Sequence, residues 1–462
     1  MHFTSRFFIA IFIIGVSLFS CSEKEKTITA EESFVSYVTN SPSSIIFGKV
    51  VLKDLIENLA FQDLPKLNVL LSKEVTTISK GFDLKEPIYF SIDSLFHANG
   101  QPTSMFLFMK VKNKDLFADK LSSLGYLIEP GKENLYVIGN NLSGKITNSF
   151  AILHLSEKAS KSSVNQALNK GNLSLDPQIK KLVANKSGLS FHIHLEHLQK
   201  LLDNQTLERP ISQKEELIAL YKNSFISSDF NLKNETLIGD IKFNFNPSLQ
   251  KRLFFKTNAQ KNLSYIAKND FVSGIGISID PLKADLFIND FYPSLLSNLS
   301  GNNLSIQLAI MSLGSRPISN LTNGSLAFAY HDLSIPTCSI ELGNKADEFK
   351  KMSTPYLCYI NIGQIHFEGN TLLNTALFKN NQSDYFKKSN DGFFLVYDSK
   401  NDTKLRSLDD KTKFLDAIST FTITLNNNGG TIILKGKKQK EGLLHQIATM
   451  YLSNIIEHLK IQ

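Results

Sequence analysis

The stretch Met105–Val111 (MFLFMKV) is a short apolar run, and after the break Lys112-Asn113 it is followed by Lys114–Leu124 (KDLFADKLSSL). An apolar run of this length with polar residues after it predicts a buried β-strand. In the second segment apolar side chains recur at three- and four-residue spacing, which predicts an amphipathic helix: Leu116, Phe117, Leu121 and Leu124. Together the two segments predict a strand that leads directly into a helix.

The same strand-then-helix unit recurs along the chain. Four other apolar runs lead into amphipathic segments: Ser44–Val50 into Leu52–Leu59, Leu189–Leu195 into Glu196–Leu202, Val272–Ile279 into Leu282–Phe287, and Cys338–Leu342 into Lys345–Met352. Their spacing is uneven, whereas solenoid repeats keep a fixed period. The pattern therefore predicts a decayed repeat or a duplicated half, and not a solenoid.

Hairpin-like pairs of strands lie between these units. Apolar runs flank short polar turns in three places: Leu135–Ile138 with Phe150–Leu155, Ile226–Leu232 with Leu237–Phe245, and Thr420–Leu425 with Thr431–Lys437. Hairpins join antiparallel strands, whereas a parallel sheet requires crossover connections. We therefore predict an α+β fold in which antiparallel β-sheets carry helices packed on one face.

The polar stretch from Asn246 to Asn262 interrupts this alternation and predicts a domain boundary. We expect an N-terminal α+β domain over residues 41–250 and a C-terminal α+β domain over residues 260–462. The chain ends in an amphipathic segment, Glu441–Leu459, with apolar residues on or near one helical face: Leu444, Ile447, Tyr451, Ile455 and Leu459. We expect this segment to dock on its own core.

The N-terminus predicts where the protein is located. A basic start precedes the apolar run Phe7–Phe19, which is too short to span a bilayer as a helix and is typical of a signal peptide. Leu18–Cys21 resembles a bacterial lipobox, in which the cysteine is acylated and becomes the new N-terminus. We predict a lipoprotein signal peptide over residues 1–20, then a lipidated Cys21 and a polar tether over residues 21–40. The alternative is an ordinary signal peptide with Cys21 as a chance thiol.

This leader predicts a body held at the membrane by lipid. We expect the outer membrane as the destination. The mixed charges of Glu23-Lys24-Glu25-Lys26 leave open whether the body faces the cell surface or the periplasm.

Composition excludes some classes of function. With 42% hydrophobic and 20% charged residues the chain can bury a full core, and its net charge of +7 is spread over 462 residues. No dense basic block lies beside aromatic residues, so nucleic-acid binding is not expected. Tryptophan, a common platform for sugar rings, is absent. Saccharide binding therefore has no support, and no cofactor is predicted.

Three short segments resemble a known family: Pro42-Ser43-Ser44 at the first strand, Gly81–Phe90 (GFDLKEPIYF), and Lys110–Asn113. Together with the lipobox, they make the chain similar to the uncharacterised Bacteroidota lipoproteins grouped as domain of unknown function 4836. The similarity is clearest in the first half of the body. It implies an exported, lipid-anchored protein and carries over no catalytic residues.

The strongest enzymatic pattern is the group His192, His194 and His197. It approaches the H-x-H-x-D-H motif of metallo-β-lactamase-fold hydrolases, whose histidines bind zinc, but Glu196 stands in place of the aspartate. Alternation along the strand predicts that both strand histidines are exposed, because the intervening apolar residues would face the core: Phe191, Ile193 and Leu195. A metal-dependent hydrolase is therefore the alternative hypothesis.

Three further residues carry chemical predictions. Cys338 and Cys358 both fall at inward positions of predicted strands, and either a disulfide or two buried thiols fits this pattern. Ser94, within Asp93-Ser94-Leu95, resembles an acceptor for Bacteroidota O-glycosylation. Neither feature discloses a function.

The sequence favours a non-enzymatic, lipid-anchored cell-envelope protein that binds or assembles with other envelope components. We expect the membrane as one partner, through Cys21, and an envelope protein as another. Thr431–Lys438 ends in clustered lysines, as guarded edge strands do, so we expect this run at the edge of a sheet where a partner could bind.

Overall fold

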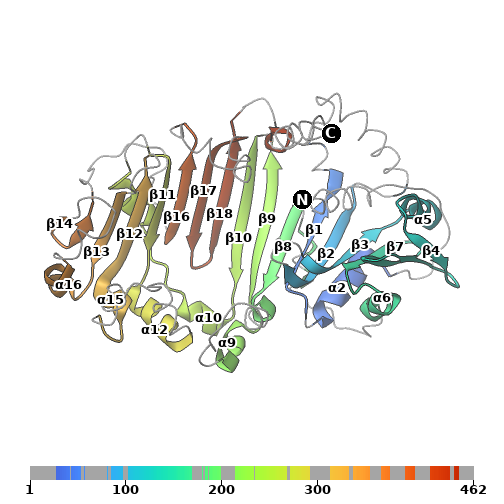
Figure 1. Cartoon of the computed structure of the whole chain (residues 1–462), viewed down its shortest axis with the longest axis horizontal. Helices are drawn as coiled ribbons and strands as arrows, with labels where there is room; N and C mark the ends of the chain where they lie inside the picture. Colours follow the sequence, from blue (N-terminus) through green and yellow to red (C-terminus); the bar gives the residue numbers. More distant parts are fainter. Residues whose placement is uncertain are drawn as a thin grey trace. The chain divides into compact units, whose positions relative to one another are not determined.

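The computed structural model describes residues 28–41, 43–53, 57, 81, 85–96, 102–168, 179–180, 183–185, 187–198, 214–233, 235–267, 271–291, 313–331, 337–353, 366–374, 391–400, 417–437 and 442–446. The chain divides into two compact units, coloured along the sequence in Figure 1. Unit 1 comprises Met1–Leu201 and Phe225–Leu232, and unit 2 comprises Leu202–Ser224 and Lys233–Gln462. Both contain mostly antiparallel strands together with helices, which confirms the predicted α+β class. The predicted signal peptide and Cys21 lie outside the described residues.

Unit 1 is an antiparallel sheet with helices. Its helices are α2 (Ala30–Asn40), α5 (Lys114–Ser123) and α6 (Lys161–Leu168). Its strands are β1 (Ile46–Val51), β2 (Pro87–Phe96), β3 (Pro102–Lys110), β4 (Leu127–Pro130), β5 (Leu135–Ile138), β6 (Leu142–Ile146), β7 (Phe150–Ser156), β8 (Leu189–His194) and β9 (Phe225–Lys233). They pair in the order β9-β8-β1-β2-β3-β7-β6-β5-β4. The predicted strand β3 and helix α5 are confirmed. The hairpin predicted between Leu135–Ile138 and Phe150–Leu155 is not formed, because β6 lies between β5 and β7 and pairs with both.

Helix α2 occupies part of the segment that the sequence predicted to be a tether. Thr29 starts it with a capping box, because the Thr29 hydroxyl accepts a bond from the Glu32 amide at 3.1 Å and the Thr29 amide donates to the Glu32 carboxylate at 2.9 Å. Phe34 is fully buried and stacks on Tyr89 of β2, with ring centroids 5.1 Å apart. The predicted polar tether over residues 21–40 is therefore wrong from Ala30 onward, because α2 belongs to the core.

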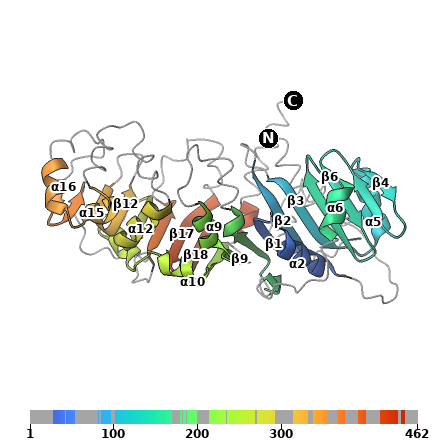
Figure 2. The same cartoon turned by 90° about the horizontal axis from the view of Figure 1, so that it is seen from below.

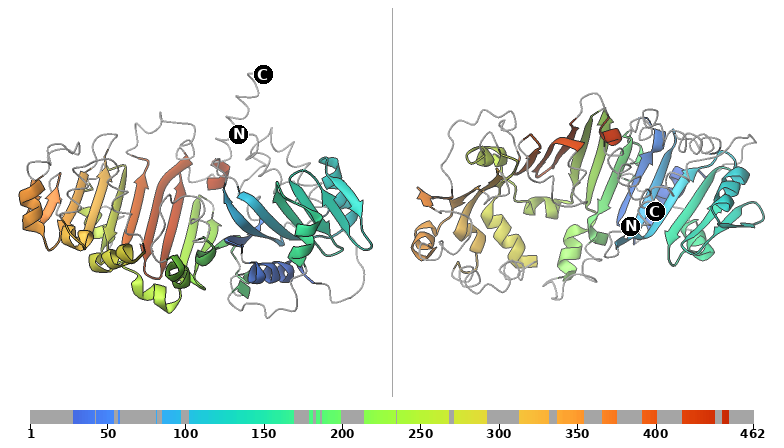
Figure 3. Two further views of the ribbon diagram at one scale, coloured as in Figure 1. Left: turned by 60° about the horizontal axis from the view of Figure 1, so that its bottom comes forward. Right: turned by 45° about the horizontal axis from the view of Figure 1, so that its top comes forward.

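The helices of unit 1 contact both faces of its sheet. Alternation along β3 sends Phe106 and Phe108 to one face, where they form a cluster with α2 and α6. Leu107 and Met109 point to the other face and form a cluster with α5. Figure 1 accordingly shows α5 on the opposite side of β3 and β7 from α2 and α6, and the left view of Figure 3 shows α2 beneath the sheet. The prediction of helices on a single face is not confirmed.

Unit 2 is a second antiparallel sheet. Its helices are α9 (Lys214–Tyr221), α10 (Pro247–Arg252), α11 (Ala259–Ser264), α12 (Pro281–Phe291), α15 (Pro317–Leu321) and α16 (Ala346–Ser353). Its strands are β10 (Thr236–Asn244), β11 (Ser273–Ser278), β12 (Thr322–Tyr330), β13 (Thr337–Leu342), β14 (His366–Glu368), β15 (Thr371–Leu373), β16 (Phe393–Asp398), β17 (Ile418–Asn426) and β18 (Gly429–Gly436). They pair in the order β10-β18-β17-β16-β11-β12-β13-β15-β14, and α10 and α12 can be located in Figure 2.

Helix α11 packs very closely on one face of this sheet. The face is built of small residues where α11 crosses it: Gly274, Gly276, Ala327 and Ala329. A Cβ atom on Gly276 would lie only 2.0 Å from the Ala259 carbonyl oxygen. Glycine is therefore required here, because the helix backbone contacts the strand backbone directly.

Six strands of each unit follow one another in the same order. In unit 1 the run is β9-β8-β1-β2-β3-β7, and in unit 2 it is β17-β16-β11-β12-β13-β15. A helix precedes the first strand in each case (α2 or α11), and another helix follows the third (α5 or α16). The common topology agrees with the duplicated half that the recurring strand–helix units predict.

Two predictions about the organisation differ from the structure. The predicted domains, 41–250 and 260–462, place β10 in the first domain, whereas β10 belongs to unit 2 and pairs with β18 along its length. Strand β18 also pairs with β17, so Thr431–Gly436, the part of the predicted edge run that lies in β18, belongs to an interior strand and not to the expected guarded edge. Clustered lysines alone could not reveal this, because β10 and β18 lie far apart in the sequence.

In the described part of the chain, no helix has both the length and the apolar character needed to cross a bilayer.

Candidate functional site

The structure places the three predicted histidines together at the end of β8, but the two strand histidines are not exposed as predicted: His192 is buried and His194 is half-buried. His192 is only 2% exposed and lies against Phe47 of β1, with ring centroids 5.3 Å apart. The predicted inward residues, Phe191 and Ile193, occupy the other face of β8 and are half-buried. The prediction was wrong because both faces of this strand carry packed side chains, so alternation alone could not tell which face is more deeply covered.

His194 and His197 stack on each other instead of converging on a point. Their ring centroids are 3.8 Å apart and the planes are inclined by 12°. His197 Nδ1 lies 2.6 Å from the Ser44 carbonyl oxygen, to which it donates, so this nitrogen holds the turn before β1. Among the described residues, which include all three histidines, no group of three or more His, Cys, Asp or Glu side chains is placed to hold a metal ion. The geometry gives the metal-dependent hydrolase no support.

Beside His192 lies a row of buried polar side chains that crosses several strands on the face covered by α2. The backbone register pairs Lys49 of β1 with Tyr89 on one side and with Ser190 on the other, and pairs Ser190 with Asp229 of β9. Side chains paired directly across strands share a face. We call these four residues the polar row. Lys49 is 7% exposed and Asp229 is 6% exposed.

Electrostatics and hydrogen bonds show what the polar row does. Burial lowers the pKa of Lys49, and the nearby carboxylates of Glu31 and Asp229 oppose this shift. The Lys49 ammonium donates to the carbonyl oxygens of Val183, at 2.7 Å, and Asn185. Lys49 therefore fixes the turn at residues 183–185 to the sheet, and its donated bonds leave the ammonium poorly suited to act as a nucleophile.

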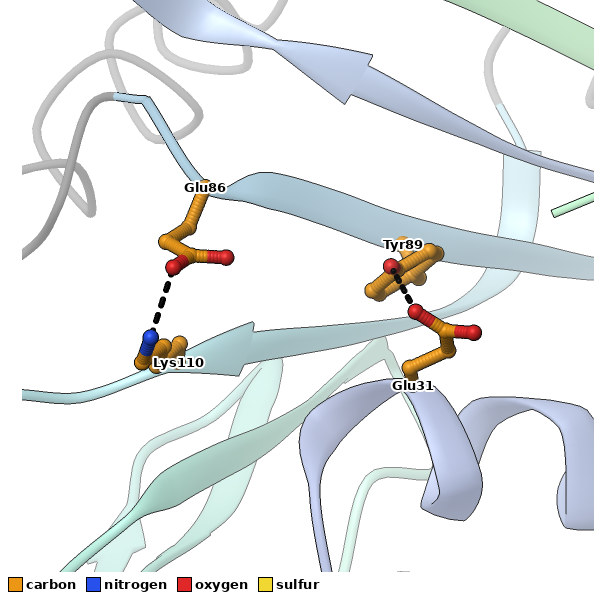
Figure 4. Close-up of polar contacts among 4 residues, drawn as sticks. All are labelled: Glu31, Glu86, Tyr89 and Lys110. Atoms are coloured by element: carbon orange, nitrogen blue, oxygen red, sulfur yellow. Dashed lines mark hydrogen bonds and ion pairs between the residues drawn. The ribbon is translucent and has the colours of Figure 1, made fainter. Parts of the chain in front are cut away.

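The tyrosine of the polar row connects α2 to the sheet. The Tyr89 hydroxyl donates to the Glu31 carboxylate at 2.9 Å, and burial, reinforced by Glu31, raises the pKa of Tyr89 (Figure 4). On the same strand the buried Ser91 hydroxyl donates to Asp93 at 2.6 Å, and Tyr37 of α2 also donates to Asp93. The Tyr89–Glu31 and Tyr37–Asp93 bonds hold α2 against β2, which is a structural role.

Sequence reasoning missed a serine–histidine contact in unit 1. His154 of β7 lies 2.7 Å from Ser163 Oγ through Nδ1 and 3.1 Å from Ser104 Oγ through Nε2. Because the Ser163 hydroxyl donates to the Ser160 carbonyl, Nδ1 carries the proton and Nε2 accepts from Ser104. This tautomer is that of a serine hydrolase. No sequence motif relates these residues, so no signal could have revealed the contact.

The surroundings of His154 argue against catalysis. Its ring stacks on Phe106 with centroids 4.1 Å apart, and burial lowers its pKa to about 4. Serine hydrolysis needs an imidazolium ion to form and be stabilised by a carboxylate, and Ser163 is a neutral partner. The Ser104–His154–Ser163 contact is therefore better explained as a satisfied core histidine.

The remaining predicted residues give little chemistry. Cys338 of β13 is 3% exposed, and burial raises the pKa of its thiol. Cys358 lies outside the described residues, so a disulfide between the two stays a prediction. Ser94 lies in β2 where the register with β3 shifts, and its O-glycosylation also stays a prediction.

The described strands of unit 2 carry an apolar face. The register across β10, β18, β17, β16 and β11 puts a continuous set of half-buried apolar side chains on one face. We call this set the apolar face: Leu237, Ile241, Ile275, Ile277, Phe393, Leu395, Phe421, Ile423, Leu425, Ile432 and Leu434. Helix α11 packs on the other face of β11 and β16. Large apolar patches of this kind mark sites where another surface binds.

The opposite face of these strands is mixed in chemistry. On β17 it carries Thr422 and Thr424, and Thr424 shares a hydrogen bond of 2.7 Å with Thr431 of β18. On β16 it carries the buried Phe394 and Val396, which pack with α11. The sequence contains this alternation in Thr420–Leu425, but it could not show that five strands extend the same face.

Comparison with solved structures adds weak similarity. The solved structure of TP0453 in crystal form I matches with a TM-score of 0.29 and 12% sequence identity, over 49% of this chain and 85% of that chain. A likeness this low supports no conclusion about fold or function. No protein-family model and no curated protein matches the sequence. The resemblance to the domain 4836 lipoproteins therefore stays a prediction.

Proposed function

We propose that this protein is a lipid-anchored component of the cell envelope that binds another envelope protein through the apolar face of unit 2. The lipobox-like Leu18–Cys21 supports an anchor at the outer membrane, and it does so from the sequence only. The observation that carries the proposal is the apolar face, because eleven apolar side chains spread over five strands make a surface suited to a polypeptide.

The polar groups of the described residues favour binding over catalysis. In the polar row, Lys49 bonds to backbone carbonyls and Tyr89 bonds to Glu31 of α2, and the stacked histidines do not converge. His154 bonds to two serines, Ser104 and Ser163. Lys49, Tyr89 and His154 therefore have structural tasks in unit 1, and we assign the function to the surface of unit 2.

Photocrosslinking in intact cells tests this proposal. A photoreactive amino acid replaces Ile423, at the centre of the apolar face, or Thr422, the adjacent half-buried residue on the other face. We expect a discrete crosslinked product from position 423 and none from position 422. Equal products from both positions, or none from either with full expression, would rule out the apolar face as the binding surface.

A further inference from the structure

Helix α12 presents apolar side chains to the solvent. Leu282 is 43% exposed and Leu286 is 48% exposed, and they lie one turn apart on the same side of the helix. An amphipathic helix normally turns its leucines toward the core. The other side of α12 already packs on unit 2 through the buried Ala284 and Phe291. The outward side is therefore a second apolar side, and we call Leu282 with Leu286 the leucine pair.

A buried carboxylate fixes this orientation of α12. Asp285 is only 1% exposed, and its two carboxylate oxygens accept from the Ile318 amide at 2.9 Å and from the Ser319 amide at 2.7 Å. Burying a carboxylate without such bonds is strongly unfavourable. Rotating α12 to cover the leucine pair would remove Asp285 from its two donors. The exposure of the leucine pair is thus held in place by the fold of unit 2.

Basic side chains lie around the leucine pair. Figures 1 and 2 show α10, α12 and α15 together at one end of the strands of unit 2. Lys283 is on α12 itself. The Asn289 side chain donates to the Ser315 carbonyl at 2.7 Å, which brings the next residue, Arg316, to the other edge of α12. The exposed basic residues of residues 247–256, 280–291 and 313–321 are Lys251, Lys256, Lys283 and Arg316.

The carboxylates of the same segments are engaged inside the protein. Asp280 accepts from the Lys283 amide at 3.2 Å, and Asp285 is bound to the start of α15. Asp290 pairs with Arg252 at 2.7 Å. Within the part of the chain that the structure describes, none of the four exposed basic side chains forms an ion pair. This end of unit 2 therefore combines a positive surface with the leucine pair.

The surface of an anionic bilayer fits this combination. A helix binds in the bilayer interface when its apolar side chains enter the boundary of the acyl chains and its basic side chains meet anionic headgroups. A stable protein interface buries roughly 800 Å² on each partner, far more than two leucines on one helix can supply. The sequence also predicts a lipid on Cys21, which would keep unit 2 close to a bilayer.

We propose that α12 rests on the surface of an anionic bilayer, with the leucine pair at the boundary of the acyl chains and with Lys283 and Arg316 at the lipid phosphates. The contact goes beyond the proposed function and rests on it only for the anchor at Cys21. It uses residues outside the apolar face. It would also orient unit 2, because the end of the strands that carries α12 then faces the membrane.

Photocrosslinking of the full chain in intact cells tests this contact. A diazirine amino acid replaces Leu286 or, as the control, Tyr330, which is 43% exposed and lies at the end of β12 far from α15. Mass spectrometry distinguishes a phospholipid adduct from a protein product. We expect at least fivefold more lipid adduct from position 286 than from position 330. Equal adducts from both positions, or a protein product without lipid adduct from position 286, would overturn the proposal.

Charge reversal measures the electrostatic part of the contact. Lys283→Glu combined with Arg316→Glu should lower the lipid adduct from position 286 at least fivefold. The control is Lys400→Glu, at an exposed position just after β16. The Asp398 amide donates to the Val272 carbonyl, and the Val272 amide donates to the Tyr330 carbonyl, so Lys400 lies at the end of the sheet away from α12. This control should leave the adduct unchanged.

A salt series covers the case in which the charge-reversed chain is misfolded. In isolated envelopes that contain the chain with its native charges, concentrated sodium chloride should lower the lipid adduct from position 286 and leave that from position 330 unchanged, because salt screens exposed charges. An adduct that resists salt would overturn the proposal. Position 423 is measured in parallel: its protein product without lipid adduct from position 286 would refute the bilayer contact alone, and the reverse result would refute the proposed function alone.

Discussion

Units 1 and 2 share a strand order, but the sheet face beneath the helix that precedes the shared strands, α2 or α11, is filled in opposite ways. In unit 1, α2 rests on large aromatic and polar side chains, among them Phe108 and Tyr89. In unit 2, α11 rests on glycine and alanine, and its backbone touches the sheet at Gly276. The same strand order therefore accommodates a helix that large side chains hold away from the sheet, as in unit 1, and a helix whose backbone contacts the sheet directly, as in unit 2. The difference predicts that the two units fail under different substitutions.

Removing a large side chain should damage unit 1 most. Phe108 is fully buried, and its ring lies 5.7 Å from Phe34 and 5.5 Å from Tyr37. Phe108→Ala should lower the free energy of unfolding of unit 1 by about 3–5 kcal/mol, because it leaves a cavity under α2. Urea-dependent pulse proteolysis with peptide mapping reports each unit separately. Phe243→Ala, at a half-buried position of unit 2, serves as the control, and a loss below about 1 kcal/mol for Phe108→Ala would contradict the packing described.

Acid should destabilise unit 1 before unit 2. Burial lowers the pKa of His154 to about 4, and burial with the charge of Lys49 lowers the pKa of His192 to about 4, against about 6.5 in an unfolded chain. Both histidines are neutral in the folded unit, so their contribution is complete above pH 6.5 and is lost as the pH falls toward 4. The loss is at most about 3 kcal/mol for each histidine. In unit 2, the buried apolar cluster between α11 and the sheet contains no histidine among its described residues.

Hydrogen exchange, corrected for its intrinsic pH dependence, measures this difference at pH 7 and pH 4.5. Peptides from β3, β7 and β8 should lose protection at the lower pH while those from β11 and β12 keep it. Replacing both histidines by glutamine should flatten the pH dependence of unit 1. Simultaneous loss in both units would show that the buried histidines do not set the acid limit.

Adding a single methyl group should damage unit 2. Gly276→Ala would place a Cβ atom 2.0 Å from the Ala259 carbonyl oxygen, a backbone atom that can yield only if α11 moves. We expect a loss of about 1–3 kcal/mol, typical of overpacking. Ser278→Ala, on the same face of β11, adds no atom and should change the midpoint of thermal unfolding little. An unchanged midpoint for Gly276→Ala would mean that α11 does not contact β11 directly.

The two polar contacts drawn in Figure 4 should differ in strength, although each involves a carboxylate of unit 1. Tyr89→Phe removes the hydroxyl of a 4% exposed side chain that bonds to Glu31, so it should destabilise unit 1 by about 1 kcal/mol. Lys110→Met removes an ion pair in which Lys110 Nζ lies 2.6 Å from Glu86 Oε1. The Lys110 side chain is 54% exposed and the Glu86 side chain is 38% exposed. We expect less than about 0.5 kcal/mol from its loss. Equal effects in urea titrations would show that burial does not separate the two contacts.

Local patterns in the sequence predicted local structure well. The runs at Met105–Val111 and Lys114–Leu124 form β3 and α5, and Thr29 with Glu32 is a capping signal readable in the sequence. Alternation failed at His192 because apolar side chains occupy the other face of β8 as well. A period of two identifies the faces of a strand but does not say which face a helix will cover.

Contacts between distant residues could not be predicted. β18 became an interior strand because it pairs with β10, nearly two hundred residues earlier in the chain. The apolar face follows from the same non-local pairing, since Leu237, Leu434 and Phe421 become neighbours only through the register of three strands. Sequence patterns specify which side chains are apolar, whereas the order of the strands decides which of them form one surface.

We propose that the apolar face of unit 2, and not the buried polar groups of unit 1, carries the function. The direct test measures recovery of the crosslinked partner from cells that express Ile423→Lys, Thr422→Lys or His192→Gln at equal levels, using a general amine crosslinker and quantitative mass spectrometry. We expect Ile423→Lys to lower recovery at least tenfold and the other two variants to retain it. Full recovery with Ile423→Lys and loss with His192→Gln would show instead that unit 1 carries the function.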